Sequence, residues 1–135
     1  MDRILLDANA LLSYLTNREP AQQVKIEQIL ESAVRGDAEI PLHQQALSEM
    51  IFVLKNVYRV RADVIAKMLF DLIHQPGTLT TNDLEWERVL KLWPSQIVDF
   101  GDAVLASAAL MHDWKIATFD KSFQKQLKTL KIAWA

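Results

Sequence analysis

The segment that most restricts the fold is "AVLASAALM", residues 103–111. Built as a helix it is apolar on every side, so other elements must cover it and it belongs in the middle of the structure. The polar turn before it carries two acids three residues apart, Asp99 and Asp102. A helix start needs only one acid as a cap, so the pair raises the question of whether the other binds a cation.

Short apolar runs alternate with helical patterns along the rest of the chain. Because this alternation is typical of a parallel sheet covered by helices on both faces, we predict one three-layer α/β domain over residues 1–135. The predicted strands are 3–6, 38–42, 115–119 and 131–135. The predicted helices are 8–17, 19–36, 44–58, 61–74, 83–93, 103–112 and 121–130.

Two local patterns add detail. Pro41 cannot donate a backbone hydrogen bond, so strand 38–42 is expected at an edge of the sheet, or with its proline at a strand end. Asn82 and Glu85 have the spacing of a capping box, which predicts that helix 83–93 begins there. That helix is expected to bury Trp86, Val89, Leu90 and Trp93.

Composition excludes several classes of protein. No apolar run approaches the ~20 residues of a membrane span. Asp2 and Asp7 interrupt the apolar N-terminus, so we expect no signal peptide. The absence of cysteine excludes disulfides and thiolate zinc sites and fits a cytoplasmic protein. A net charge of −2 argues against coating nucleic acid by bulk electrostatics, although a local basic patch is compatible with it.

Acidic residues stand where predicted strands end. "RILLD" ends in Asp7 and "KIATFD" ends in Asp120. The carboxyl ends of parallel strands lie at one edge of the sheet, which is where such folds bind ligands. Asp102, at the start of the buried helix, could face the same edge.

Each of these positions also has a simpler interpretation. Asp7, Asp120 and one of the Asp99–Asp102 pair precede predicted helices, where an aspartate N-cap contributes ~1 kcal/mol. Glu49, in "ALSEMIFVL", lies well inside a predicted helix and cannot be an N-cap. It is either exposed or partly buried with a partner, and the pattern alone leaves both alternatives open.

Convergence of these acids would raise their pKa values unless a cation neutralised them. With no cysteine and no clustered histidine, oxygen ligands favour Mg²⁺ or Mn²⁺ over zinc. Carboxylate-held magnesium is the arrangement used in phosphoryl chemistry. The spacing therefore predicts a divalent-metal site at the sheet edge.

Four motifs together resemble a known family. "LLDANALL", "LSEMIFVL", "VDFGDAVLASAAL" and "IATFD" occur in this order and resemble the PIN-domain family, and in size its single-domain VapC-type toxins. The resemblance implies a three-layer α/β/α sandwich on a short central parallel sheet. It also implies an endoribonuclease that depends on Mg²⁺ or Mn²⁺ held by a quartet of acids.

The resemblance also implies particular site residues. It places the catalytic acids at Asp7, Glu49, Asp102 and Asp120. Asp99 matches an additional acid of some subgroups, and whether Asp99 or Asp120 lies closer to the metal is left open. Asn9 and Thr118 match positions that orient ligands and substrate. Gly101 stands where alanine is common, and we expect this departure not to affect the chemistry.

Roles and partners follow from the same resemblance. Asp7 and Asp102 would be direct or water-bridged metal ligands, while Glu49 and either Asp120 or Asp99 would hold the water that attacks an RNA phosphodiester. VapC-type proteins dimerise and are neutralised by a small antitoxin. A homodimer, an antitoxin partner and an RNA substrate are therefore expected here.

Three further features are ambiguous. Lys55, Arg59 and Arg61 cluster between two long helices and could contact an RNA backbone. The lysine run at 121–131 is typical of a solvated helix face, although it too could guide RNA. Residues 44–74 hold more apolar side chains than one core stripe needs, which indicates either core packing or an antitoxin surface. The four tryptophans are expected in the core or an interface.

Two other functions compete with the nuclease. A receiver-like phosphoacceptor domain has a similar fold, but it needs an acidic pair near its first strand and a lysine after its last. Here Asn9 stands in place of the second acid, and Glu49 has no counterpart. A catalytically silent PIN-like binding module would use its acids only as caps.

Overall fold

The four strands form one parallel sheet in the order β3-β2-β1-β4. The computed structural model describes all 135 residues. The strands are β1 (Asp2–Leu6), β2 (Ala38–His43), β3 (Thr78–Thr81) and β4 (Lys115–Ala117). β1 lies inside the sheet, with Asp2 opposite Ala38 of β2 and Leu6 opposite Ala117 of β4. All four carboxyl ends therefore meet at one edge.

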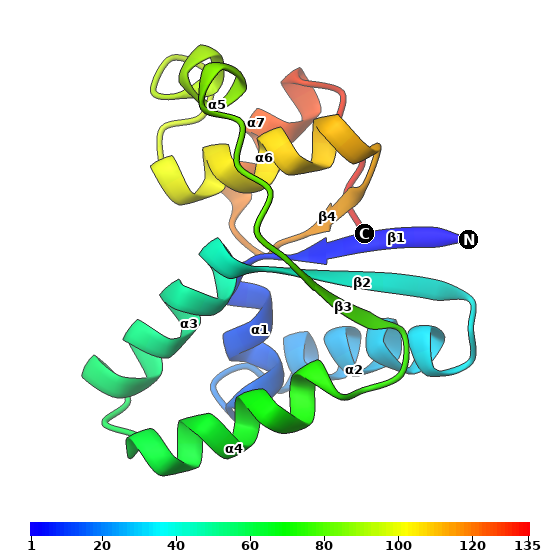
Figure 1. The fold of residues 1–135 in the computed structure, drawn as a ribbon, viewed down its shortest axis with the longest axis vertical. Coiled ribbons are helices and arrows are strands. Elements are labelled where there is room, and N and C mark those ends of the chain that lie inside the picture. Colours follow the sequence, from blue (N-terminus) through cyan, green and yellow to red (C-terminus); the bar gives the residue numbers. More distant parts are fainter.

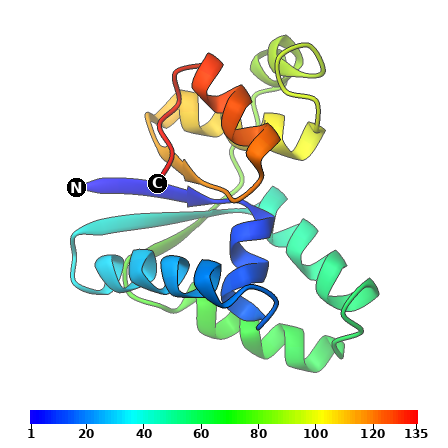
Figure 2. The ribbon, with the colours of Figure 1, turned by 180° about the vertical axis from the view of Figure 1, so that it is seen from behind.

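Helices cover both faces of this sheet (Figure 1). One layer holds α1 (Ala8–Leu15), α2 (Pro20–Val34), α3 (Gln44–Asn56) and α4 (Ala62–Ile73). The other holds α5 (Trp86–Leu92), α6 (Phe100–His112) and α7 (Lys121–Thr129). Figure 2 shows the same division from behind. The predicted three-layer α/β/α sandwich on a parallel sheet is thus confirmed.

The apolar helix lies inside, as predicted. Eight residues of α6 are buried, and six of them, among them Ala103, Val104, Leu105 and Ala108, belong to the hydrophobic core. Small side chains such as alanine let α6 approach its neighbours closely. The core fixes the first turn of α6, which carries Asp102, relative to the sheet.

The prediction for Pro41 was wrong, because β2 is an internal strand. The Ile40 amide donates to the carbonyl of Gly77 beside β3, so alternation turns the Pro41 nitrogen toward β1. The β1–β2 register extends only as far as Glu39. Pro41, which has no N–H to donate, therefore lies just beyond the residues of β2 that pair with β1.

The predicted strands differ from the observed ones in two further places. β3, with the sequence TLTT, was not predicted, although it pairs with β2 from Ile40↔Thr78 to His43↔Thr81. Residues 131–135, predicted as a strand, form only an isolated bridge between Ile116 and Trp134. None of the helices is both long and apolar enough to cross a membrane.

Helix α5 differs from its prediction as well. It begins at Trp86 after Glu85, and no side chain caps it, so the predicted capping box does not form. Val89 is buried, but Trp86 and Leu90 are each 56% exposed. The apolar spacing was correct, yet half of that face meets solvent.

Candidate active site

Asp7 lies where β1 passes into α1, at the carboxyl edge of the sheet. Its Oδ1 accepts a hydrogen bond from the Ala10 amide at 2.8 Å, so Asp7 is the N-cap of α1. The residue is only 3% exposed. A charged carboxylate this deeply buried is costly unless a partner neutralises it.

Asp99 and Asp102 have different roles at the start of α6. Asp99 is the N-cap, and its Oδ1 accepts from the Asp102 amide at 2.9 Å. The Asp102 side chain caps nothing and lies in the first turn of the helix. The structure thus resolves which member of the pair is the cap.

Asp120 has the corresponding place after β4. Its Oδ1 accepts from the amides of Ser122 and Phe123 at 2.9 and 3.2 Å, which caps α7. The Thr118 hydroxyl accepts from the Asp120 amide at 3.1 Å. Thr118 is buried, and its hydroxyl also lies close enough to the Asp7 carboxylate to lower the pKa of that group. It therefore lies between the ends of β1 and β4.

Glu49 is half-buried on α3 with a partner. Gln45, one turn earlier, donates from Nε2 to Glu49 Oε1 at 3.0 Å. The same carboxylate oxygen packs against Gly101 of α6, where an added Cβ would overlap it. Gly101 is therefore more than a neutral departure, because its missing side chain makes room for Glu49.

Burial and mutual repulsion raise the pKa values of Asp7, Glu49 and Asp102. Burial raises the pKa of Asp7 to about 6, against the hydrogen bonds from Thr118 and Ala10. Burial raises the pKa of Asp102 to about 8, with the nearby charge of Asp99 as the next cause. Burial likewise raises the pKa of Glu49, opposed by the Gln45 hydrogen bond.

The sources of these shifts show that the acids converge. The pKa of Asp102 is raised by the charges of Asp99, Asp7, Asp120 and Glu49, in that order after burial. None of the five acids forms an ion pair with a lysine, arginine or histidine. The sequence-predicted acids therefore meet on one edge as an uncompensated negative cluster.

The chemistry of this donor set fits a hard divalent cation. Uncompensated carboxylate oxygens without thiol or clustered imidazole favour Mg²⁺ or Mn²⁺. No three histidine, aspartate or glutamate side chains are placed to hold one ion directly. Magnesium commonly uses one or two carboxylates and several waters, so this looser arrangement fits it.

Two of the predicted accessory groups stand beside the acids. Thr118 contacts both Asp7 and Asp120 as described above. Asn9 is exposed in the first turn of α1 and lines a cavity of about 390 Å³ together with Asp120. The same cavity is lined by Arg18, which the sequence patterns did not single out.

The predicted basic cluster is separate from the acids. Lys55 lies six positions beyond Glu49 on α3, about 9 Å further along the helix axis. Arg61 is exposed and pairs with Asp63 at 2.6 Å. Arg59 lies in the turn between α3 and α4, which Figure 1 shows away from the sheet edge.

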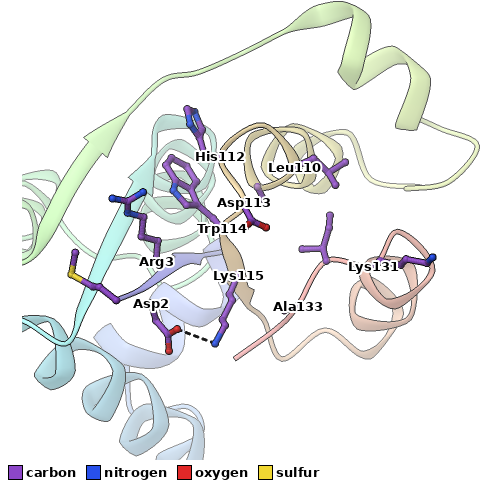
Figure 3. Close-up of a pocket in the computed structure, with 12 residues that line it drawn as sticks. Asp2, Arg3, Leu110, His112, Asp113, Trp114, Lys115, Lys131 and Ala133 are labelled. Atoms are coloured by element: carbon purple, nitrogen blue, oxygen red, sulfur yellow. Dashed lines mark hydrogen bonds and ion pairs between the residues drawn. The ribbon is translucent and has the colours of Figure 1, made fainter.

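The largest cavity, about 600 Å³, does not contain the acids. Figure 3 shows it between the start of β1, the end of α6 and the C-terminal segment. Its charges are largely paired, for example Lys115 Nζ with Asp2 Oδ1 at 3.1 Å. The amino edge of the sheet therefore offers no comparable concentration of unpaired charge.

Several residues at the site were missed by sequence reasoning. The i, i+4 spacing does place Gln45 on the same helix face as Glu49, but it did not predict the hydrogen bond to that carboxylate. Gly101 was noticed, but its contact with Glu49 depends on how α3 packs on α6. Arg18 follows α1 in a polar turn, and no periodicity or motif marks it.

Comparisons with known proteins concern the family and the fold of this chain. The chain matches the PIN domain family model over residues 4–127. VapBC-1 from nontypeable Haemophilus influenzae has a similar fold, with a TM-score of 0.68, 14% identity, and coverage of 98% of this chain and 96% of that one. PAE2754 from Pyrobaculum aerophilum gives a TM-score of 0.64, 18% identity, and coverage of 96% and 93%.

A third similar structure is VapBC2 from Rickettsia felis bound to a DNA fragment from their promoter. Its TM-score is 0.62 at 14% identity, covering 91% of this chain and 92% of that one. Identities this low demonstrate the fold alone. No curated protein matches the sequence. The family match, which spans residues 4–127 of 135, shows that the chain belongs to the PIN domain family.

Proposed function

We propose that this protein is a Mg²⁺- or Mn²⁺-dependent endoribonuclease and the toxin of a type II toxin–antitoxin pair. PIN domains are generally nucleases. The observation that carries the proposal is the proximity of Asp7, Glu49, Asp99, Asp102 and Asp120, none of which forms an ion pair with a cationic side chain. A divalent cation bound at such a site would neutralise the negative charge of the carboxylates and also that of a bound phosphate.

In this proposal the acids divide the work according to their surroundings. Asp7 and Asp102 would hold the ion, because both are substantially buried and have the strongly raised pKa values. A bound Mg²⁺ would supply stabilisation of the negative charge that develops on the phosphate oxygens. Asp99 and Asp120 each use Oδ1 for capping, which leaves Oδ2 to orient an attacking water or the ion.

In this proposal Glu49 would receive the proton of the attacking water. Gln45 holds its Oε1, so Oε2 is free to accept, and the raised pKa of Glu49 favours protonation at that atom. Asn9 and Thr118 would orient the ligand and the substrate. Attack by the water on phosphorus would then break a backbone phosphodiester of RNA.

Exposed apolar surface supports the proposed partners. Phe52, Val57, Val64 and Phe70 of the α3–α4 pair are 65%, 65%, 44% and 57% exposed, and we assign this face to a small antitoxin. Trp86 and Leu90 of α5 and Val98 in the loop after it are also exposed, and we assign them to a homodimer contact. The proposed site of action is the cytoplasm, where RNA is the substrate.

An RNA cleavage assay tests the activity. The parent protein is incubated with mixed-sequence single-stranded RNA in Mg²⁺, in Mn²⁺ and in EDTA, beside Asp102→Asn. We expect cleavage only with metal, and a loss of at least about 100-fold in the variant, because a metal ligand is removed. Asp102→Asn is sharper than Asp7→Ala, which also removes the cap of α1.

The matched control is Asp71→Asn, the same chemical change at an exposed ion pair on α4. It should cleave like the parent. Equal activity of Asp102→Asn and the parent would contradict the proposal. A parent that neither cleaves RNA nor binds Mg²⁺ would support the silent binding module.

A further inference from the structure

A cavity of about 390 Å³ opens beside the acids; it is lined by one of them, Asp120, and by Asn9. Arg18, Glu19, Gln22 and Phe119 complete its lining. The volume falls in the range of ~300–1,000 Å³ that is usual for small-ligand sites. A polymeric ligand bound at the acids can therefore place a neighbouring group in this cavity.

Arg18 is held in a fixed position by neutral groups. Its Nε and Nη2 donate to Ser13 Oγ at 3.2 and 3.1 Å, and Nη2 also donates to the Asn9 carbonyl at 2.8 Å. Ser13 is fully buried and in turn donates to Gln22 Oε1 at 2.8 Å. This network orders the guanidinium before any ligand binds, so less side-chain entropy is lost on binding.

The charge of Arg18 is not used within the protein. Glu19 and Asp120 line the same cavity, yet neither forms an ion pair with it. Its Nη1 donates to no protein acceptor, whereas Nε and Nη2 do. An exposed guanidinium with free N–H groups is suited to a phosphate, which it can bind through charge-assisted hydrogen bonds.

We propose that Arg18 binds a backbone phosphate of single-stranded RNA, next to the phosphodiester at the acids, and that Ser13 positions it. The proposal rests on the ribonuclease function proposed above and adds the contact that sets the path of the strand. Because a phosphate is the same in every nucleotide, this contact fixes register and carries no sequence preference.

Salt-dependent binding tests the proposal. A fluorescein-labelled mixed-sequence RNA of about eight nucleotides is titrated in Mg²⁺ with Asp102→Asn, which prevents cleavage. Anisotropy gives Kd over a range of NaCl concentrations, and Arg18→Gln is then added to the same background. We expect affinity to fall about tenfold at low salt. The slope of log K against log salt should fall by about 0.7, the value for one phosphate contact on a single strand.

Two further variants serve as controls for the charge of Arg18 and for its positioning. Arg35→Gln removes the same charge at the far end of α2, where Arg35 pairs with Asp37, and should change neither Kd nor slope by these amounts. Ser13→Ala keeps the charge of Arg18 but removes its support. It should weaken binding by less than Arg18→Gln while the salt slope stays within error of the parent, which separates positioning from charge.

The outcomes separate this inference from the proposed function. If the parent cleaves RNA but Arg18→Gln binds RNA with unchanged affinity and slope, the Arg18 contact is wrong and the nuclease stands. If Arg35→Gln has the same effect as Arg18→Gln, the loss is general electrostatics and the contact is also wrong. If the parent neither binds nor cleaves RNA, the proposed function fails and this inference with it.

Discussion

At the scale of single residues, capping and ligand binding are compatible roles. Asp7, Asp99 and Asp120 each cap a helix through one oxygen and still belong to the acidic cluster. An N-cap lies where a strand or loop turns into a helix, and in a parallel sheet those turns gather at the carboxyl edge. Helix capping and ligand binding, which are alternatives on the sequence alone, can therefore be roles of the same carboxylates.

Asp102 is the exception, and this predicts an unusual effect on stability. It caps nothing, and burial and four neighbouring acids oppose its charge. In EDTA at about pH 9, Asp102→Asn should therefore raise the melting temperature, because a repelled carboxylate becomes a neutral amide. Differential scanning calorimetry measures the change.

A contrasting variant is Asp120→Ala, which removes the side chain that caps α7. It should lower the free energy of unfolding by about 1 kcal/mol. The gain of Asp102→Asn should shrink toward pH 5, where the parent carboxyl is already neutral given its pKa of about 8. A variant less stable than the parent at both pH values would show that the charge of Asp102 is not opposed.

Gly101→Ala is predicted to act through Glu49. The new Cβ would overlap the Glu49 carboxylate, whose end can rotate away, so the fold should tolerate the change. Alanine in a helix is favoured over glycine by roughly 0.5–1 kcal/mol, so unfolding by urea should need slightly more denaturant. Turnover should fall as Glu49 leaves Gln45, but by less than in Glu49→Gln.

A structure of the variant would show the movement directly. If Glu49 keeps its hydrogen bond to Gln45 in Gly101→Ala, or if the variant unfolds more easily than the parent, this account of Gly101 is contradicted.

At the scale of elements, predictions succeeded where one segment carries its own signal. The apolar α6 and the strand–acid junctions at Asp7 and Asp120 needed no information from elsewhere in the chain. β3 was missed because TLTT is short and largely polar, and it becomes a strand only by pairing with β2. The exposure of the apolar stripe of α5 could not be predicted, since residue spacing cannot show whether another layer covers that face of the helix.

Gly77 shows how one position fixes the packing of two elements. It joins α4 to β3 at a φ of +84°, and an added Cβ would lie 2.7 Å from both Cβ and O of Ala33 on α2. Gly36 has almost the same φ, +83°, with nothing within 4 Å. Comparing substitutions at the two glycines therefore separates the cost of the left-handed backbone from the cost of steric overlap with Ala33.

Gly36→Ala should cost about 1 kcal/mol of unfolding free energy, from the left-handed backbone alone. Gly77→Ala should cost about 1–3 kcal/mol more, because backbone and side chain must shift to relieve the overlap. Urea unfolding followed by circular dichroism gives both values. Equal losses in the two variants would mean that the α2 contact does not restrict Gly77.

At the scale of the whole molecule, the topology of a parallel sheet was enough to predict the edge at which the acids meet. It was not enough to predict the contacts made across that edge. The position of Glu49 depends on the packing of α3 against α6, and that of Arg18 on a buried serine in the preceding helix. Such contacts follow from how whole elements pack, which no single motif records.

The uncompensated cluster makes a prediction for the stability of the entire fold. Asp7 and Asp102 have pKa values raised from 3.8 to about 6 and about 8 in the folded protein. Between about pH 4 and pH 8 the folded state therefore binds more protons than the unfolded state. Stability that these groups contribute at low pH is lost as the pH rises, so in EDTA the free energy of unfolding should fall across this window.

Magnesium should reverse that loss, because it binds the charged carboxylates of the folded protein and competes with protons. Urea unfolding at several pH values, with EDTA or with excess Mg²⁺, measures both effects. The stabilisation should be largest near pH 8, reaching about 2.7 kcal/mol when Mg²⁺ is 100 times its Kd, and smallest near pH 5. Asp102→Asn should lose most of it and Asp71→Asn none, since Asp71 lies in an exposed ion pair on α4. A magnesium effect that is the same at pH 5 and pH 8, or the same in Asp102→Asn, would place the ion somewhere other than among these acids.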